Sequence, residues 1–504
     1  MKHITATLNN LGIIISLNNL KINLTNKELT KLQNKYTLSV KNELNNYITK
    51  IKMYSIFSNN NEQFIVFPKF SLLYLLEKKY INDVNNVLSN GKNINMHYIG
   101  KSNSNQVLIV DHILNNIYNK NNFINGVTLK LATGQGKTFN AMDIISKINK
   151  KTLIIVPTSY LLQQWVNLLE QYFPNNTIGT FYSKAKKDGD IIVAVINSVA
   201  LLDEFKVNER IISVNKLFSK CGLVIFDESH LYISKMFKKV FYRLNCKYIL
   251  GLSATPDQRL YNQDDIHLLN IGPILDASTI PNIKLDEHSF ISDVNVIKYN
   301  GPDQYTKIIL NNNGIIDYNA ILNMFIDDMY RNQLIVNNIK NLLNQSLCIF
   351  VFTDRRKHAE LLYNILLNQT DDNDIFNASV PELNLQKPII LYGGSKDNEI
   401  KEAKEVSNVI FTTYAYSSTG VSINKMNALI LASPRKSNMT QIIGRIFRLG
   451  SDQAKKRIII DIVDNKSFVK KQFYQKRRHA YIKQGCEFIE TTINYEDIDV
   501  EYAL

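Results

Sequence analysis

The chain of 504 residues carries 59 lysines and arginines against 45 aspartates and glutamates, a formal net charge of +14 at pH 7. This length is too great for one hydrophobic core and predicts about three domains, and the composition is typical of a soluble globular protein. The positive charge favours a polyanionic partner such as nucleic acid over an acidic surface, although a generally basic surface explains it equally well.

The cysteines and the apolar segments argue against several other classes. The four cysteines, Cys221, Cys246, Cys348 and Cys486, are far apart and include no C-x-x-C pair, so neither a zinc site nor a disulfide framework is indicated. Free cysteines of this kind favour a protein of a reducing compartment. The longest apolar run, "IIVAVINSVALL", is shorter than a membrane span and is interrupted by Asn197. The amino terminus lacks a compact basic start and a cleavage site, so no signal peptide is expected.

In chain order, residues 1 to about 95 predict only a small mixed α and β domain. From about residue 129 to 255, short apolar runs alternate with helical patterns, as in "KTLIIVPTS", "DIIVAVINS", "CGLVIFDES" and "KYILGLSATP". Repeated units of this kind predict a parallel sheet with helices on both faces. Ligands bind at the carboxyl ends of such strands, where these runs end in polar loops.

The segment "LKLATGQGKTFNAMDII", residues 129–145, places a glycine-rich turn between a strand-like run and a helical pattern. Consecutive backbone N–H groups in such a turn, with the amino end of the next helix, form a cradle for phosphates. Lys137 is then expected to reach the β- and γ-phosphates, and Thr138 to complete the shell of a magnesium ion. Leu131 stands where the usual pattern has its first glycine. The alternative is an ordinary glycine turn that caps a helix.

The segment "LVIFDESH" follows about ninety residues later and ends in adjacent carboxylates. In nucleotide hydrolysis Asp227 is expected to hold magnesium and Glu228 to orient and deprotonate the attacking water. An acid that caps a helix is the alternative for this pair, and the phosphate loop upstream favours the catalytic interpretation.

A second series of apolar runs, "SLCIFVFTD", "PIILYGGS", "SNVIFTTYA", "NALILASP" and "RIIIDIVD", follows residue 295 and predicts a second α/β domain. The segment between the two series, "GPILDASTIPNIKLDEHSFISD", suits a hinge. In "QIIGRIFR", helical spacing places Gln441, Arg445 and Arg448 on nearly one face. The acidic tail from Cys486 is expected to be a solvated extension, with a docking segment as the alternative.

Taken in order, "ATGQGKT", "VPTSYLLQQW", "DESH", "SATP", "TTYAYSSTGVSI" and "QIIGRIFR" resemble the motifs of the superfamily 2 helicases. The resemblance covers residues 100 to about 465, and the details look most like the helicases of large cytoplasmic DNA viruses, the group with the poxvirus transcript-release helicase. It implies an α/β fold of two RecA-like parallel-sheet domains with an ATP cleft between them, plus a small N-terminal α+β domain. The implied boundaries are 1–95 for the accessory domain, 96–285 and 286–485 for the RecA-like domains, and 486–504 for the acidic tail.

The resemblance also implies roles for individual residues. Gln106 is expected to contact adenine, although a surface glutamine is an equal alternative, and Asp227 and Thr138 are expected to bind Mg²⁺. His230, Ser253 and Thr255 would couple hydrolysis to domain movement. Arg445 and Arg448 would act as arginine fingers, with Gln441 sensing the γ-phosphate or water. The residues expected around the nucleotide are Thr133, Gly134, Gln135, Gly136, Lys137, Thr138 and Gly420.

The fifth motif departs from the family pattern, because Thr419 and Ser422 stand where an acid and an aspartate are usual. In the family this aspartate contacts the ribose, so sugar selectivity is in doubt, but hydrolysis is not.

Small hydroxyl and backbone groups at strand ends are expected to grip the phosphates of the nucleic acid without reading bases. For each of them a plain turn or cap is an equal alternative. Trp165 is expected in the core. The basic runs "DRRKH" and "KKQFYQKRRHAYIK" suit a nucleic-acid face or a charged helix in water. The residues expected along the polymer are Pro157, Thr158, Asn197, Ser198, Thr353, Gly394 and Thr413.

The sequence therefore predicts a helicase or translocase that uses ATP and Mg²⁺, with DNA favoured over RNA by the resemblance alone. Its expected setting is viral transcription or replication in the host cytoplasm, with viral RNA polymerase or transcription factors as partners and a monomer as the oligomeric state. The rivals are an RNA helicase, a duplex-DNA translocase that does not separate strands, and a scaffold that binds nucleic acid or polymerase without hydrolysis.

Overall fold

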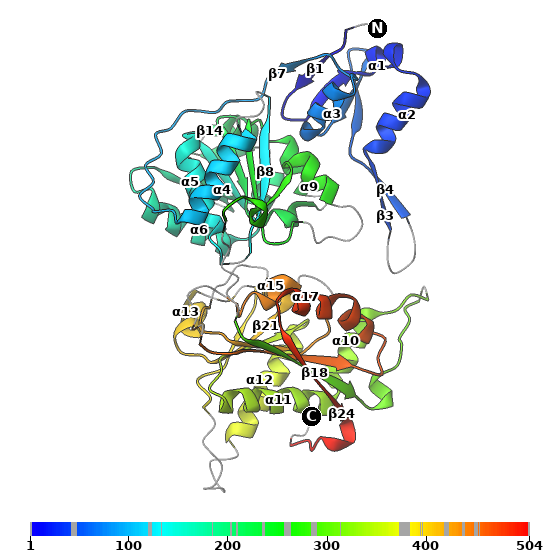
Figure 1. Ribbon diagram of the computed structural model, residues 1–504, viewed down its shortest axis with the longest axis vertical. Coiled ribbons are helices and arrows are strands. Elements are labelled where there is room, and N and C mark those ends of the chain that lie inside the picture. Colours follow the sequence, from blue (N-terminus) through cyan, green and yellow to red (C-terminus); the bar gives the residue numbers. More distant parts are fainter. Residues whose placement is uncertain are drawn as a thin grey trace. The chain divides into compact units, whose positions relative to one another are not determined.

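The computed structural model of the chain divides into two compact units, Met1–Asp286 and Glu287–Leu504. It describes residues 3–41, 48–118, 123–132, 134–183, 185–201, 204–207, 210–233, 237–256, 264–283, 290–312, 314–371, 384–393, 395, 397–417, 423–435, 439–447, 452 and 454–501. Each unit is built on its own sheets (Figure 1). The predicted α/β class with two parallel-sheet domains is confirmed.

The first unit begins with a small five-stranded sheet in the order β5-β6-β2-β1-β7. Its strands are β1 (Thr5–Leu8), β2 (Ile13–Ser16), β5 (Ser55–Asn59), β6 (Glu62–Phe67) and β7 (Asp83–Asn86). The helices α1 (Leu17–Asn23), α2 (Asn26–Lys35) and α3 (Leu72–Glu77) and the hairpin β3 (Thr37–Lys41) and β4 (Ile48–Lys52) complete this region.

The buried side chain of Lys69 connects this region to the rest of the first unit. Its Nζ donates hydrogen bonds to the backbone oxygens of Phe241, at 3.1 Å, and Leu244, at 2.6 Å. Burial lowers the pKa of Lys69 to about 8.

The main sheet of the first unit has eight strands in the order β11-β10-β12-β9-β15-β16-β8-β17. All neighbours pair in parallel except β10 and β11. The strands are β8 (Asn125–Lys130), β9 (Thr152–Val156), β10 (Ile178–Tyr182), β11 (Ala185–Lys187), β12 (Ile191–Val195), β15 (Leu223–Phe226), β16 (Tyr248–Ser253) and β17 (Ile274–Asp276). Its helices are α4 (Ser104–His112), α5 (Lys137–Ile148), α6 (Ser159–Tyr172), α7 (Ile196–Leu201), α8 (Val214–Phe218) and α9 (Asp264–Asn270), and β13 (Glu204–Val207) pairs with β14 (Arg210–Ser213).

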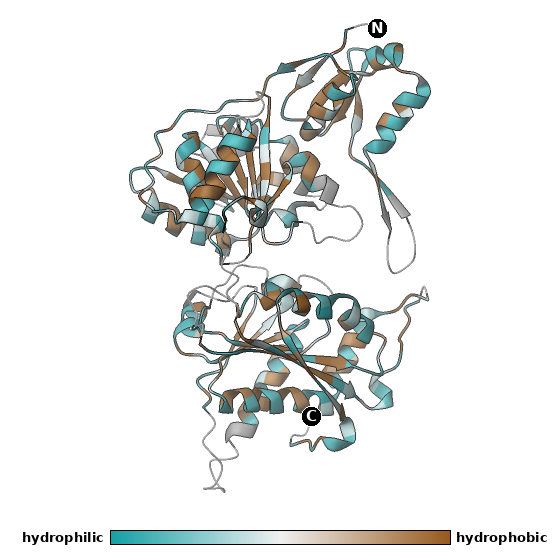
Figure 2. Cartoon of the chain, in the orientation of Figure 1, coloured by the Kyte–Doolittle hydropathy of each residue, from teal (hydrophilic) through white to brown (hydrophobic). Residues whose placement is uncertain are grey.

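The central strands of this sheet are mostly apolar because helices cover both faces (Figure 2). All five residues of β9 and all four of β15 are buried. Polar residues therefore enter where the strands end, and the loops at the carboxyl edge carry the predicted motifs.

The second unit is built on a seven-stranded sheet in the order β20-β21-β19-β22-β23-β18-β24, with every described pair parallel. The strands are β18 (Ser292–Asn300), β19 (Ile349–Thr353), β20 (Ile389–Leu391), β21 (Val409–Thr413), β22 (Ala428–Leu431), β23 (Arg457–Asp464) and β24 (Glu487–Asn494). The helices are α10 (Tyr318–Asp327), α11 (Met329–Asn344), α12 (Arg356–Asp371), α13 (Asp397–Glu405), α14 (Tyr414–Ser417), α15 (Met439–Ile443), α16 (Lys470–Gln472) and α17 (Arg478–Lys483), the last two joined by a π-helical segment, Phe473–Arg477.

The acidic segment after Cys486 does not form the solvated extension that the sequence predicts. Its residues Glu487–Asn494 form β24, which pairs with β18 from Asp293 to Asn300. Most of its side chains are exposed, so its composition gives little sign of a strand. The pairing satisfies backbone groups of β18 that would otherwise lie at the sheet edge.

No helix among the described residues is both long and apolar enough to cross a membrane.

Candidate active site

The glycine-rich segment forms a tight loop between β8 and α5. Gly134 and Gly136 have φ angles of +86° and +85°, which glycine adopts without strain. Nζ of Lys137 donates hydrogen bonds to the backbone oxygens of Leu131, at 2.9 Å, and Ala132, at 3.2 Å, so its ammonium lies inside the curl of the loop. Thr138 follows on the first turn of α5, and Thr133 lies outside the described residues.

Gln106 packs directly against this loop. Its Oε1 accepts a hydrogen bond from Asn103 N as part of a capping box for α4. Its Nε2 lies 2.5 Å from the point where a Cβ on Gly136 would stand. The glutamine is therefore buried beside the phosphate loop rather than on the open surface.

Asp227, at the carboxyl end of β15, forms hydrogen bonds with Glu228, Ile155 and Tyr232. Its Oδ1 accepts a hydrogen bond from Glu228 N at 2.9 Å, and its backbone N donates to Ile155 O at 3.0 Å. Tyr232 OH donates to the backbone oxygens of Asp227, at 2.8 Å, and Ile155, at 2.9 Å. Burial, and then the charge of Glu228, raise the pKa of Asp227 to about 6, while the charge of Lys137 lowers it.

Trp165 contributes a contact that the sequence does not predict. It is buried in the core as expected, but its Nε1 also donates a 2.8 Å hydrogen bond to Oδ2 of Asp227. The two residues are 62 positions apart, so spacing could not reveal the contact. The one feature of the sequence that points to such a contact is the tryptophan itself, because a buried indole N–H needs a hydrogen-bond acceptor.

Glu228 and three further predicted residues form one cluster beside Asp227. Glu228 has a φ of +49°, a left-handed conformation that is costly for a residue with a Cβ and is common at functional sites. Nδ1 of His230 lies 3.4 Å from Oε2 of Glu228 and 3.0 Å from Oγ of Ser253. The same Oγ accepts a hydrogen bond from Thr255 N at 3.1 Å. Of the predicted coupling residues, His230 thus lies in direct contact with the second carboxylate, and Ser253 and Thr255 connect to it through His230.

The strand order explains why these segments meet. In the sequence β15-β16-β8, the segments that carry Asp227, Ser253 and Lys137 leave the same edge of three successive strands. Lys137 lies close enough for its charge to lower the pKa of Asp227. The edge therefore combines a phosphate-sized loop, an ammonium group and two carboxylates.

In the second unit, Gln441 lies on α15 and Arg445 on the turn that follows it. The helix ends at Ile443, and hydrogen bonds from Arg445 N to Ile442 O and from Ile446 N to Ile443 O continue it as tighter turns. The single helical face predicted for "QIIGRIFR" is therefore only partly formed. Arg448 lies outside the described residues.

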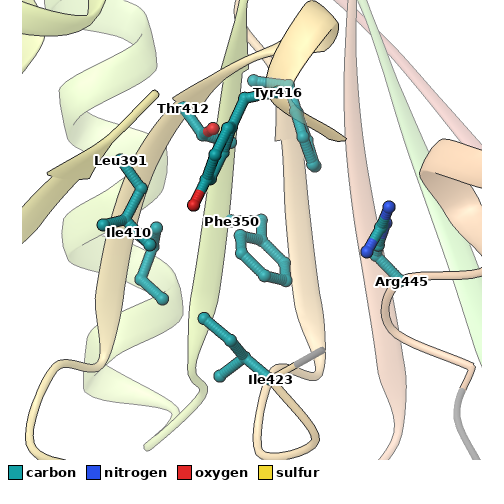
Figure 3. Close-up of a pocket in the computed structure, with 8 residues that line it drawn as sticks. Phe350, Leu391, Ile410, Thr412, Tyr416, Ile423 and Arg445 are labelled. Atoms are coloured by element: carbon teal, nitrogen blue, oxygen red, sulfur yellow. The ribbon is translucent and has the colours of Figure 1, made fainter. Parts of the chain in front are cut away.

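Arg445 is 8% exposed and borders a pocket that is lined mostly by apolar side chains. Its guanidinium lies on the side of the pocket opposite Leu391 and Ile410 (Figure 3). Arg445 is the one cation among the eight described residues that line the pocket. These residues are Phe350, Phe352, Leu391, Ile410, Thr412, Tyr416, Ile423 and Arg445.

The residues expected along the polymer fall into two groups. Pro157 and Thr158 are half-buried where β9 ends, and on α7 Asn197 is exposed and Ser198 is half-buried. Thr353 is fully buried, and its hydroxyl donates to Arg355 O at 2.9 Å. Thr413 Oγ1 accepts a hydrogen bond from Tyr416 N at 3.4 Å. The cap interpretation therefore accounts for these two threonines, and Thr158 is likewise the N-cap of α6. Gly394 and Gly420 lie outside the described residues.

The first unit resembles proteins that process nucleic acids. Residues 99–258 match the family described as "Type III restriction enzyme, res subunit". This range contains the phosphate loop, both carboxylates and the cluster around Ser253.

Longer similarities extend into the second unit. A protein of African swine fever virus (isolate Pig/Kenya/KEN-50/1950), provisionally named an ATP-dependent RNA helicase, is 32% identical over 387 residues, which cover 73% of this chain and 70% of that protein. Transcript termination protein A18 of Yaba-like disease virus is 24% identical over 360 residues, 66% of each chain. The solved structure of Mss116p bound to single-stranded RNA and AMP-PNP covers 75% of this chain and 73% of that one at 16% identity, with a TM-score of 0.50.

Proposed function

The chain belongs to the superfamily 2 helicases, and we propose that it couples ATP hydrolysis to movement along DNA during viral transcription. The observation that carries the chemistry is the edge of the first sheet, where the strand order β15-β16-β8 brings the phosphate loop with Lys137 to the same side as Asp227 and Glu228. ATP-dependent helicase activity is shared by its named relatives. DNA as the track and transcription as the setting are the parts proposed here.

The phosphate loop binds the nucleotide through its backbone and Lys137. The N–H groups of a glycine-rich turn and the amino end of α5 attract phosphate oxygens, and Lys137 exchanges its hydrogen bonds with Leu131 and Ala132 oxygens for ion pairs with phosphate. Gln106, packed on Gly136, is placed to contact the adenine next to this loop.

Asp227 and Glu228 have different roles in the proposed hydrolysis. Oδ1 and Oδ2 of Asp227 each accept one protein hydrogen bond, which leaves lone pairs for a hydrated magnesium ion together with the hydroxyl of Thr138. When bound, Mg²⁺ neutralises charge on the β- and γ-phosphate oxygens. Glu228, one residue on, orients the attacking water and accepts its proton. His230, Ser253 and Thr255 sense the state of Glu228 through the contacts described above.

The second unit supplies cations for the transition state. Arg445 and Arg448 are proposed as arginine fingers and Gln441 as the sensor of the γ-phosphate or water. Such an arginine is worth about 10³–10⁵ in rate, so hydrolysis depends on both units. This dependence converts hydrolysis into movement.

The names of the relatives point to two different tracks. The relative from Yaba-like disease virus is named for transcript termination, which favours a helicase that acts on DNA beside viral RNA polymerase in the host cytoplasm. The relative from African swine fever virus is named an RNA helicase, which favours RNA. Contacts from Pro157, Thr158, Asn197 and Ser198 fit either backbone, because they grip phosphates and do not read bases.

The test is ATP hydrolysis by the purified chain alone and with single-stranded DNA, duplex DNA or single-stranded RNA, with Lys137→Ala as the blank. Strong stimulation by single-stranded DNA that the variant lacks supports the proposal, and strand separation by fluorescence distinguishes a helicase from a translocase. Stimulation by RNA alone replaces DNA with RNA as the track. Tight binding without turnover on any polymer refutes the enzyme and leaves the scaffold.

A further inference from the structure

Trp165 is the single tryptophan of the chain, and its one polar atom is committed to the proposed metal-binding carboxylate. The indole N–H is a donor only, with no capacity to accept. Its 2.8 Å hydrogen bond to Oδ2 fixes the rotation of the Asp227 carboxylate, because Oδ1 is held at the same time by Glu228 N. Two fixed oxygens leave the carboxylate one orientation.

Helix α6 holds the indole in place. Trp165 is 2% exposed and packs in the main core with Leu162, Val166 and Leu169, its neighbours on the buried side of α6. A side chain packed in this way has few rotamers available, so the position of its N–H follows the position of the helix.

The same helix begins at the predicted nucleic-acid contact. Thr158 is the N-cap of α6, and its Oγ1 accepts a hydrogen bond from Leu161 N at 3.3 Å. Trp165 follows seven residues later, about 10 Å along the helix axis. A shift of the Pro157–Thr158 loop therefore reaches the Asp227 carboxylate through one rigid element.

A second connection joins the same two places. β9, which ends at Val156, and β15, which ends at Phe226, are neighbours in the sheet. The hydroxyl of Tyr232 bridges the backbone oxygens of Ile155 and Asp227. The backbone of Asp227 is thus connected to β9, before the Pro157–Thr158 loop, and its side chain is connected to α6, after that loop.

We propose that Trp165 is a positioning residue that orients Asp227 for magnesium and links that orientation, through α6, to nucleic acid bound at Pro157 and Thr158. The inference rests on the proposed function, since it assigns to that site the way in which the polymer stimulates hydrolysis. It adds a physical connection, through α6, between the nucleic-acid contact at Pro157 and Thr158 and the carboxylate of Asp227.

The first test compares Trp165→Phe, which keeps an aromatic ring in the core and loses the donor, with Leu162→Ala, which removes packing from the same helix and leaves the hydrogen bond. Trp165→Phe should raise the Mg²⁺ concentration for half-maximal ATPase activity by about tenfold, as is typical when a group that orients a metal ligand is removed. The KM for ATP at saturating Mg²⁺ should change little, and the stimulation ratio with and without nucleic acid should fall. Leu162→Ala should lower the Tm and change both readouts less than Trp165→Phe does, because the indole donor remains.

The second test uses the wild-type chain, so it does not depend on the folding of a variant at Trp165. Because the chain holds one tryptophan, its emission on excitation at the indole band reports the surroundings of Trp165, which include this hydrogen bond. Mg²⁺ with AMP-PNP should change the emission, single-stranded DNA should change it further, and Asp227→Ala should abolish the response to Mg²⁺ with AMP-PNP.

The outcomes separate this inference from the proposed function. The role of Trp165 is overturned if Trp165→Phe keeps the wild-type Mg²⁺ dependence and the wild-type stimulation by nucleic acid. It is also overturned if the emission does not respond while the wild-type chain hydrolyses ATP. Either result leaves the proposed helicase function intact. A wild-type chain that hydrolyses no ATP with any polymer refutes the proposed function itself.

Discussion

Nε of Arg477 donates a 2.8 Å hydrogen bond to Oδ2 of Asp461, and both side chains are buried in the second unit. Tyr481 OH donates to the same oxygen at 2.7 Å. Arg477 is thus a core residue within the run "KKQFYQKRRHAYIK", in which Lys470, Lys471 and Lys476 are exposed. The basic segment is anchored by one arginine and presents its other charges to solvent.

Replacing Arg477 with alanine should destabilise the second unit strongly, because Asp461 is left as an uncompensated buried charge. Loss of one partner of a buried ion pair typically costs about 3–5 kcal/mol. Chemical denaturation followed by circular dichroism measures the change. The exposed neighbour Lys476→Ala is the matched control and should stay within about 0.5 kcal/mol of wild type. Equal stability of the two variants would contradict the anchoring role.

The exposed lysines of this segment should contribute to nucleic-acid affinity. Replacing Lys470, Lys471 and Lys476 together with alanine should weaken binding and make log K less steep against log salt, by about 0.7–0.9 for each phosphate that the variant no longer neutralises. Fluorescence anisotropy with labelled single-stranded DNA at several salt concentrations gives the slope. An unchanged slope would assign these lysines to a solvated face.

Gly136→Ala should impair nucleotide hydrolysis for two separable reasons. The φ of +85° strains any residue with a Cβ, at a cost of about 1–3 kcal/mol, and the new Cβ meets Nε2 of Gln106 at 2.5 Å. Gln106→Ala in the same chain removes only the second reason. ATPase rates should therefore fall in Gly136→Ala and recover in part in the double variant, after comparison with Gln106→Ala alone. No recovery would assign the whole defect to backbone strain.

The buried Lys69 predicts a pH dependence of stability. Its pKa is about 8 in the folded chain against 10.5 for an ordinary lysine, so between these values the unfolded chain binds more protons. The contribution of Lys69 to the free energy of unfolding should therefore rise with pH across this window, with a slope of up to about 1.4 kcal/mol per pH unit. Denaturation of wild type and Lys69→Met from pH 7.5 to 9.5 measures the difference in slope, with the exposed Lys92→Met as control. Parallel curves for wild type and Lys69→Met would contradict the prediction.

The parts of the fold that the sequence predicts well are those that depend on local pattern. β9 and β15 are buried along their whole length because both faces of their sheet are covered, and the glycines of the phosphate loop mark a backbone that only glycine adopts without strain. A parallel sheet then brings the loops that carry Lys137, Asp227 and Ser253 to one edge, which is why motif order alone indicates the site.

The parts that the sequence does not predict depend on contacts between distant residues. The hydrogen bond from Trp165 to Asp227 spans 62 positions, and nothing in the helical pattern of α6 distinguishes it from ordinary core packing. The end of α15 at Ile443 was missed because the four-and-three spacing of "QIIGRIFR" fits a longer helix, whereas the chain tightens after Gly444. The strand β24 was missed because edge strands expose most of their side chains and so lack the alternating pattern.

The position of β24 also bears on how the second unit is made. Its partner β18 begins at Ser292, so pairing joins residues nearly two hundred positions apart. On the ribosome, β18 is exposed along one side until Glu487–Asn494 have been synthesised, and contacts of such long sequence separation form slowly. Of the described strands of this sheet, β24 is therefore the last to be synthesised, and a ribosome that stops before β24 leaves an open strand able to pair with other nascent chains.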